Sequence, residues 1–171
     1  SITSDEGESV LSRGVCWNIN PNPTINDAKT TDGAGGGTYE SNLTNLYGGT
    51  SYFIRAYATN SFGTGYGMAL SFKTTGEPPS SPNVKTEKIT SLGQFNSTIN
   101  GIVNAKYYPA TVSFEYGTTK SYGNNISANP TVVEGNRNIA VSAELSGLSA
   151  ETVYHYRVKA VNSLGTSYGN D

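Results

Sequence analysis

The sequence has little charge, a single cysteine, a single histidine and no long apolar run. One Cys and one His in 171 residues exclude a disulfide framework, a zinc-finger module and any Cys/His metal cluster. No run of about 18 apolar residues occurs, so no segment is expected to cross a membrane as a helix. A net charge of −2 gives no basic surface for nucleic acid.

The residues that are abundant favour an all-β chain. Twenty Gly and seven Pro divide the sequence into short segments, and between them lie alternating runs rich in Val, Ile, Tyr and Thr. These residue types suit a pleated surface, and no stretch keeps apolar residues at helical spacing. Many short strands with frequent turns predict a β-sandwich. Twelve Tyr supply much of the apolar area for its core.

An internal repeat sets the domain count. Residues 42–67 align with residues 144–169 without a gap, and twelve of these 26 positions are identical at an offset of 102. A match of this length indicates a duplicated domain. The identical pairs are Leu43/Leu145, Leu46/Leu148, Thr50/Thr152, Tyr52/Tyr154, Arg55/Arg157, Ala58/Ala160, Asn60/Asn162, Ser61/Ser163, Gly63/Gly165, Thr64/Thr166, Tyr66/Tyr168 and Gly67/Gly169.

The repeat predicts two tandem sandwiches. We expect one domain over residues 1–75, a linker over 76–82 and a second domain over 83–171. The sequence TTGEPPSSP between the copies contains three prolines, which favour an extended, semi-rigid spacer.

Each copy of the repeated block contains a candidate tyrosine corner. A Leu-x-x-Leu pair is followed six residues later by Tyr52 in the first copy and by Tyr154 in the second. This spacing is typical of a Tyr whose hydroxyl bonds back to upstream backbone at the edge of a sandwich. Both residues are therefore predicted to be buried structural residues.

With these residues in view, the chain resembles the fibronectin type III family. The pattern Leu-x-x-Leu-x-x-x-Thr-x-Tyr-x-[apolar]-x-[apolar]-x-Ala-x-Asn occurs at 43–60 and again at 145–162, and VSFEYGTTKSYG (112–123) looks like the family's third strand. RGVCWNINPNPTI (13–25) resembles a variant found in large secreted or surface proteins of Bacteroidetes-type bacteria. The resemblance implies immunoglobulin-like sandwiches in an extracellular or cell-surface protein.

Each copy is expected to lack terminal strand material. The first has only SITSDEGES and three residues before Arg13, and the second stops at Asp171, where the first continues through LSFKTT. Counting strands gives about five in the first copy and six in the second, against seven in a complete sandwich. Two interpretations remain open: a fragment of a longer repeat array, or assembly by strand donation from a neighbouring chain.

The candidate binding surface is an outward-facing set on one strand: Phe53, Arg55 and Tyr57. Such a set could stack sugar rings or meet another domain. The second copy has His155 and Lys159 in place of the two aromatic residues. No catalytic, cofactor-binding or metal-binding residues are predicted, and acidic residues are not paired for glycoside chemistry.

Three further features have plain structural interpretations. Cys16 has no His in its domain to form a dyad, and we expect a free thiol packed under the following loop. His155 is expected at the surface without a ligand set. The segment 26–37 has two Asp and a Gly-rich run but not the EF-hand spacing, so a flexible surface loop is favoured over a calcium site.

Strand alignment also predicts two cross-strand neighbours. Glu115 and Arg157 should face each other on the outer sheet face, as an exposed ion pair worth about 0–1 kcal/mol. The equivalent residues of the first copy are Cys16 and Arg55.

These observations predict a non-catalytic extracellular module, a spacer, adhesive segment or subunit of a cell-surface or filamentous assembly. Its partners would be proteins, either neighbouring repeats or identical subunits. The alternative is an accessory carbohydrate-binding region of a secreted carbohydrate-active enzyme, with glycans as partners and contact through Phe53, Arg55 and Tyr57.

Overall fold

The computed structural model describes Ile2 and residues 7–171. Ser1 and residues 3–6, at the start of the predicted first domain, lie outside the described residues. The chain divides into two compact units, unit 1 (Ser1–Pro78) and unit 2 (Pro79–Asp171), and the division falls inside the predicted linker.

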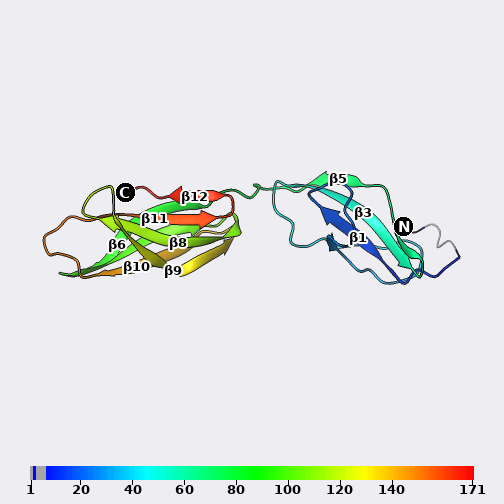
Figure 1. The fold of residues 1–171 in the computed structure, drawn as a ribbon, viewed down its shortest axis with the longest axis horizontal. Helices are drawn as coiled ribbons and strands as arrows, with labels where there is room; N and C mark the ends of the chain where they lie inside the picture. Colours follow the sequence, from blue (N-terminus) through cyan, green and yellow to red (C-terminus); the bar gives the residue numbers. More distant parts are fainter. Residues whose placement is uncertain (1, 3–6) are drawn as a thin grey trace. The chain divides into compact units, whose positions relative to one another are not determined.

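All regular elements of the described residues are β-strands (Figure 1), which confirms the all-β prediction. Among these residues no helix is long and apolar enough to cross a membrane.

Unit 1 is one antiparallel sheet, in the order β2-β1-β3-β4 with β5 also paired to β3. β4 pairs with the second half of β3 and β5 with its first residues, Ser51 to Ile54. The strands are β1 (Ser12–Asn18), β2 (Ala28–Lys29), β3 (Ser51–Asn60), β4 (Gly63–Tyr66) and β5 (Leu70–Lys73).

Unit 2 has its strands in two layers (Figure 1): β6, β7 and β10 pair on one side, and β9, β8, β11 and β12 on the other. A single pairing, Ser142 with Asn129, joins the layers through β9 and β10. The strands are β6 (Asn83–Leu92), β7 (Asn96–Asn104), β8 (Tyr107–Gly117), β9 (Asn124–Gly135), β10 (Ile139–Ser146), β11 (His155–Asn162) and β12 (Gly165–Tyr168).

The core of unit 2 lies between these two layers. Alternate residues of facing strands point into it, as the two-residue period of a strand requires, and Phe114, Val112 and Val158 are fully buried there. Ile99 and Val103 of β7 and Leu145 of β10 belong to the same cluster. This is the layered packing that the type III resemblance implies.

The expected count of six strands in the second copy is wrong by one, because Gly165–Tyr168 forms the short strand β12. β12 pairs with β11 as β4 pairs with β3 in unit 1. The counterpart of β5 would begin directly after Asp171, at the repeat offset of 102. Among the described residues, β11 has no partner that corresponds to β5.

Unit 1 has the expected five strands, but its described residues form only one layer. Residues 37–44 align with β10 at the repeat offset, yet they form no strand apart from the bridge between Ile2 and Gly37. In unit 2, β10 pairs with β7 along its whole length, and unit 1 has no counterpart of β7 among the described residues. A strand without a partner leaves its backbone groups unpaired, so the segment adopts another path.

The missing layer leaves the inner face of unit 1 partly open. This inner face contains Val15, Ile54 and Ala56, which are half-buried, and Leu70, which is 64% exposed. Leu70 belongs to it because it pairs with Ile54, and directly paired residues share a face. Ala58 is half-buried, whereas its identical counterpart Ala160 is fully buried. The same sequence pattern is therefore a core in one unit and an open face in the other.

We predict that two identical leucines differ in their contribution to stability. Leu145 is 3% exposed, whereas its repeat counterpart Leu43 is half-buried. Leu145→Ala should cost unit 2 about 2–5 kcal/mol, as for a buried leucine, and Leu43→Ala should cost unit 1 about 1 kcal/mol or less. Hydrogen exchange of the full chain, read in the strands of each unit, measures both. Equal losses of unfolding free energy in the two variants would contradict the difference in burial between Leu145 and Leu43.

Candidate functional site

The predicted surface set on β3 does not form one exposed patch. Tyr57 is only 4% exposed, and its hydroxyl donates to the carbonyl of Thr30 at 2.7 Å. The expected exposure of Tyr57 is therefore wrong, because the segment after β1 lies over this part of the outer face. Phe53 and Arg55 are half-buried, so one of the two predicted rings remains accessible beside the arginine.

Arg55 forms an arginine–tyrosine stack. Its guanidinium lies 4.5 Å from the centre of the Tyr66 ring, and its Nε donates to the Gly67 carbonyl at 2.9 Å. The repeat counterparts, Arg157 and Tyr168, make the same stack in unit 2 at 4.1 Å. Cations over an aromatic face are stabilised by the ring quadrupole. The two copies of the repeat have identical residues at both positions, but the sequence analysis did not predict that they touch. The signal was the separation of eleven residues between Arg and Tyr, which is the same in both copies.

Charged residues gather around this stack in unit 2. Arg157 pairs directly with Glu115 across β11 and β8, as predicted, and its Nη2 and Nε donate to one carboxylate oxygen at 2.7 and 2.9 Å. Lys159 approaches the other oxygen at 3.3 Å. A second aromatic ring, Tyr122, lies 4.5 Å from the Arg157 guanidinium. Glu115, Tyr122 and Arg157 border a shallow hollow of 470 Å³.

Partial burial of Glu115 opposes its ionisation, but hydrogen bonds from Arg157 and Lys159 outweigh burial and hold the pKa of its carboxyl below the ordinary value of 4.5. The Arg157 side chain is 29% exposed, so solvent screens part of the energy of the pair. The arrangement is a structural cluster in which two cations, Arg157 and Lys159, share one carboxylate.

His155 lies beside the end of the chain. Its Nδ1 is 2.7 Å from the Asp171 carboxylate, which also lies 3.4 Å from Lys120. The hydrogen bond with His155 lowers the pKa of Asp171. Within the part of the chain that the structure describes, no three His, Cys, Asp or Glu side chains are grouped to hold a metal ion.

Cys16 is a buried thiol under the loop that follows β1. It is fully buried, and its Sγ donates to the carbonyl of Pro23 at 3.4 Å. Burial raises the pKa of the thiol, against the opposing effect of the paired Arg55. A protonated, enclosed thiol is a poor nucleophile.

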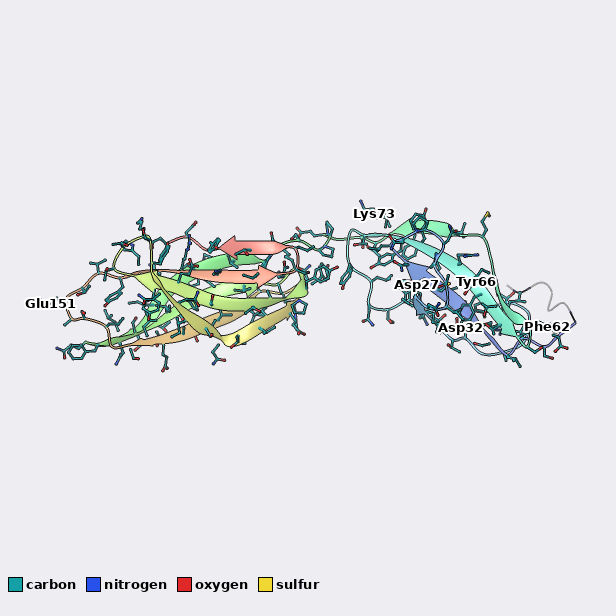
Figure 2. The ribbon with its side chains drawn as sticks, in the orientation of Figure 1. Asp27, Asp32, Phe62, Tyr66, Lys73 and Glu151 are labelled. Atoms are coloured by element: carbon teal, nitrogen blue, oxygen red, sulfur yellow. The ribbon has the colours of Figure 1, made fainter. Side chains whose placement is uncertain are left out.

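The two aspartates of segment 26–37, labelled in Figure 2, serve the loop itself. The Asp27 carboxylate accepts from the backbone N–H of Thr24 at 2.7 Å, and Asp32 accepts from the hydroxyls of Thr30 and Ser41, both at 2.6 Å. Hydrogen bonds from Thr24 and then Asn18 lower the pKa of Asp27. The segment is a hydrogen-bonded cover over β1, and it includes the short strand β2.

Both predicted corner tyrosines accept a hydrogen bond from upstream backbone. The N–H of Tyr47 donates to the Tyr52 hydroxyl at 3.0 Å, and the N–H of Ser149 donates to the Tyr154 hydroxyl at 3.2 Å. Tyr52 is 6% exposed and buried as expected, but Tyr154 is only half-buried.

The difference between the corners coincides with an apolar cleft that sequence reasoning missed. A cavity of 860 Å³ opens in unit 2 between the end of the β6–β7 hairpin and the start of β11. Most of its lining surface is apolar, and Tyr154 and Tyr156 line it on the β11 side. Residues lining it include Ile89, Leu92, Ile99, Leu148, Val153 and Tyr154.

Comparison with known proteins identifies no family for this chain. No family model matches, and no curated protein matches. Among solved structures, the chicken CNTN1 FN1–FN3 domains align with 93% of this chain and 50% of that chain, at 17% identity and a TM-score of 0.29. The chain thus spans about half the length of that structure. A TM-score this low carries no argument, so the interpretation rests on this chain's own strands and contacts.

We predict that the corner hydrogen bonds stabilise both units. Tyr154→Phe and Tyr52→Phe should each lower the free energy of unfolding by about 1 kcal/mol, because each leaves a backbone N–H without its acceptor. Tyr116→Phe, at a tyrosine of β8 outside the corner motif, is the control. Denaturant unfolding of the full chain measures the change, and an unchanged midpoint would count against a stabilising role.

We predict that the Glu115 pair contributes to stability only above acidic pH. Because the pKa of the Glu115 carboxyl is lowered in the folded state, the stabilisation by the pair is complete above the unfolded-state pKa of about 4.3. This stabilisation is lost as pH falls through the folded-state pKa. Glu115→Gln should therefore destabilise unit 2 by about 0–1 kcal/mol at neutral pH and have no effect well below pH 4. Urea unfolding at both pH values tests this, with the exposed Glu144→Gln as control; a pH-independent difference would contradict it.

Proposed function

We propose that this chain is a non-catalytic extracellular module, a spacer or subunit of a cell-surface or filamentous protein assembly. Its two units share the repeated sequence block, and in both of them the repeated residues make a corner hydrogen bond and an arginine–tyrosine stack. The type III resemblance, including its bacterial surface variant, supports an extracellular setting. Proteins, as neighbouring repeats or identical subunits, are the proposed partners.

The open inner face of unit 1 carries this proposal. In unit 2 the equivalent face is covered by β6, β7 and β10, and Val158 and Ala160 are fully buried beneath them. In unit 1 the counterparts Ala56 and Ala58 are half-buried, and Leu11 and Leu70 are 65% and 64% exposed. Exposed apolar faces of this kind mark protein interaction sites. In unit 2 the equivalent face is covered by paired β-strands, so we expect a partner to cover the face of unit 1 in the same way.

The carbohydrate-binding alternative is less well supported. It relied on two aromatic rings beside Arg55, and the burial of Tyr57 removes one of them. Arg55 itself is engaged by Tyr66 and the Gly67 carbonyl, which reduces what it could offer a sugar hydroxyl.

Self-association through the inner face tests the proposed function. The full chain should associate with rising concentration in analytical ultracentrifugation, and Leu70→Glu should weaken association at least about tenfold by placing a charge on the apolar face. Phe62→Glu is the matched control, because Phe62 is 81% exposed but lies in the β3–β4 turn (Figure 2). A monomer at every concentration, or equal effects of both variants, would contradict the proposal.

A further inference from the structure

The linker between the two units is held at each of its ends by the unit that adjoins it. On the side of unit 1, the Gly49 N–H donates to the Thr75 carbonyl at 3.2 Å, beyond the end of β5. On the side of unit 2, the Asn162 side-chain amide donates to the Ser80 carbonyl at 2.8 Å, and Pro82 is buried. The predicted spacer 76–82 is therefore anchored next to its first residue and again in its second half.

Gly49 shows how closely unit 1 holds the linker. A Cβ atom at this position would lie 2.7 Å from the Gly76 carbonyl oxygen and 2.8 Å from the Pro78 nitrogen, which is closer than van der Waals contact allows. The backbone of Gly49 is left-handed, with a φ of 57°, but its repeat counterpart Glu151 has a φ of 53° and carries a full side chain. Left-handed backbone therefore does not by itself require glycine here, whereas the close passage of the linker does.

Asn162 holds the other end of the linker through a nearly buried side chain. It is 8% exposed, and its Oδ1 accepts from the N–H groups of Leu164 and Gly165 at 2.8 and 3.1 Å, in the turn between β11 and β12. Besides donating to Ser80, its Nδ2 donates to the carbonyl of Ala105 at 3.1 Å. A side-chain amide offers two N–H donors, so both donors of this asparagine have a carbonyl partner.

The repeat counterpart Asn60 makes the same turn. Its Oδ1 accepts from the N–H groups of Phe62 and Gly63 at 3.0 and 3.2 Å. Among the described residues, a Cβ atom on Gly63 would have nothing within 4 Å, whereas one on Gly165 would lie 3.3 Å from the Ser81 Cβ. The turn is thus a property of the repeat, and its contact with the linker is found in unit 2. Asn60 therefore provides a matched control for its counterpart.

We propose that Gly49 and Asn162 are the two anchors of a one-residue joint, so that the freedom between the units is confined to the backbone around Pro79. Unit 1 holds the chain as far as Pro78, and unit 2 holds it from Ser80 onward. Proline fixes its own φ at about −65°, and a residue before a proline is restricted to extended conformations. The inference goes beyond the proposed assembly function and does not depend on self-association, because the joint lies inside one chain.

Backbone ¹⁵N relaxation of the full chain at a dilute concentration tests the joint directly. The amides of Gly76, Ser80 and Ser81 should have order parameters of about 0.8 or more, like those of the strands, whereas a free linker would give values below about 0.6. Low values in the unsubstituted chain would overturn the proposal, and no variant that could fail to fold is needed for this result. Dilution separates the measurement from self-association, so the two proposals can fail independently.

Asn162→Asp tests the anchor on the side of unit 2. The variant keeps the Oδ1 acceptor of the turn, but its carboxylate cannot donate to the Ser80 carbonyl. The order parameters of Ser80 and Ser81 should fall below about 0.6 while those of β8 and β11 stay high, and Asn60→Asp should leave the linker unchanged. Pro82→Ala, which removes a buried ring of the linker and leaves the turn intact, is a second variant and should mobilise the same two amides. Ordered amides in both variants, or an equal effect of Asn60→Asp, would overturn the role of this anchor.

Gly49→Ala tests the anchor on the side of unit 1. The added Cβ should displace the linker from unit 1 and lower the order parameter of the Gly76 amide, while the Ser80 amide stays ordered. An unchanged Gly76 amide would overturn the role of this anchor.

Discussion

The structure depends on one requirement: an apolar sheet face needs a second layer, and each strand edge needs a neighbour. Unit 2 meets the first condition, because β6, β7 and β10 enclose Phe114 and Val158 completely. Unit 1 has the same inner-face pattern on β1 and β3, without that layer among the described residues. The repeated block in one chain thus lies in a closed core in unit 2 and on a partly open face in unit 1.

The outer faces of the two units show a different solution. In both, an arginine stacks on the tyrosine of the following hairpin strand, Arg55 on Tyr66 and Arg157 on Tyr168. Unit 2 then adds the Glu115 ion pair, whereas unit 1 places Cys16 at that register position. A buried, protonated thiol cannot form an ion pair with Arg55 as Glu115 does with Arg157. Unit 1 instead places the loop after β1 over Cys16. The outer face of unit 1 is therefore partly a second, small core.

Period-two alternation was enough to predict which residues of one strand share a face. Alignment of the strands placed Glu115 opposite Arg157, and the Leu-to-Tyr spacing placed both corner tyrosines. Alternation could not predict the burial of Tyr57, since it assigns a face but not what lies over that face; the cover comes from a loop without periodic pattern. The cleft was missed for a related reason, because it lies between segments that are distant in the sequence.

Strand boundaries in this chain follow the supply of partners more closely than residue preference. Val153 has a high strand propensity and is not in a strand, whereas its counterpart Ser51 has a low one and begins β3. The difference is β5, which pairs with Ser51 and has no equivalent beside Val153. The same holds for residues 37–44, which align with β10 but lack the counterpart of β7. Propensity spans only about 1 kcal/mol, so in these largely exposed segments it does not form a strand without a neighbour that supplies the hydrogen bonds of the ladder.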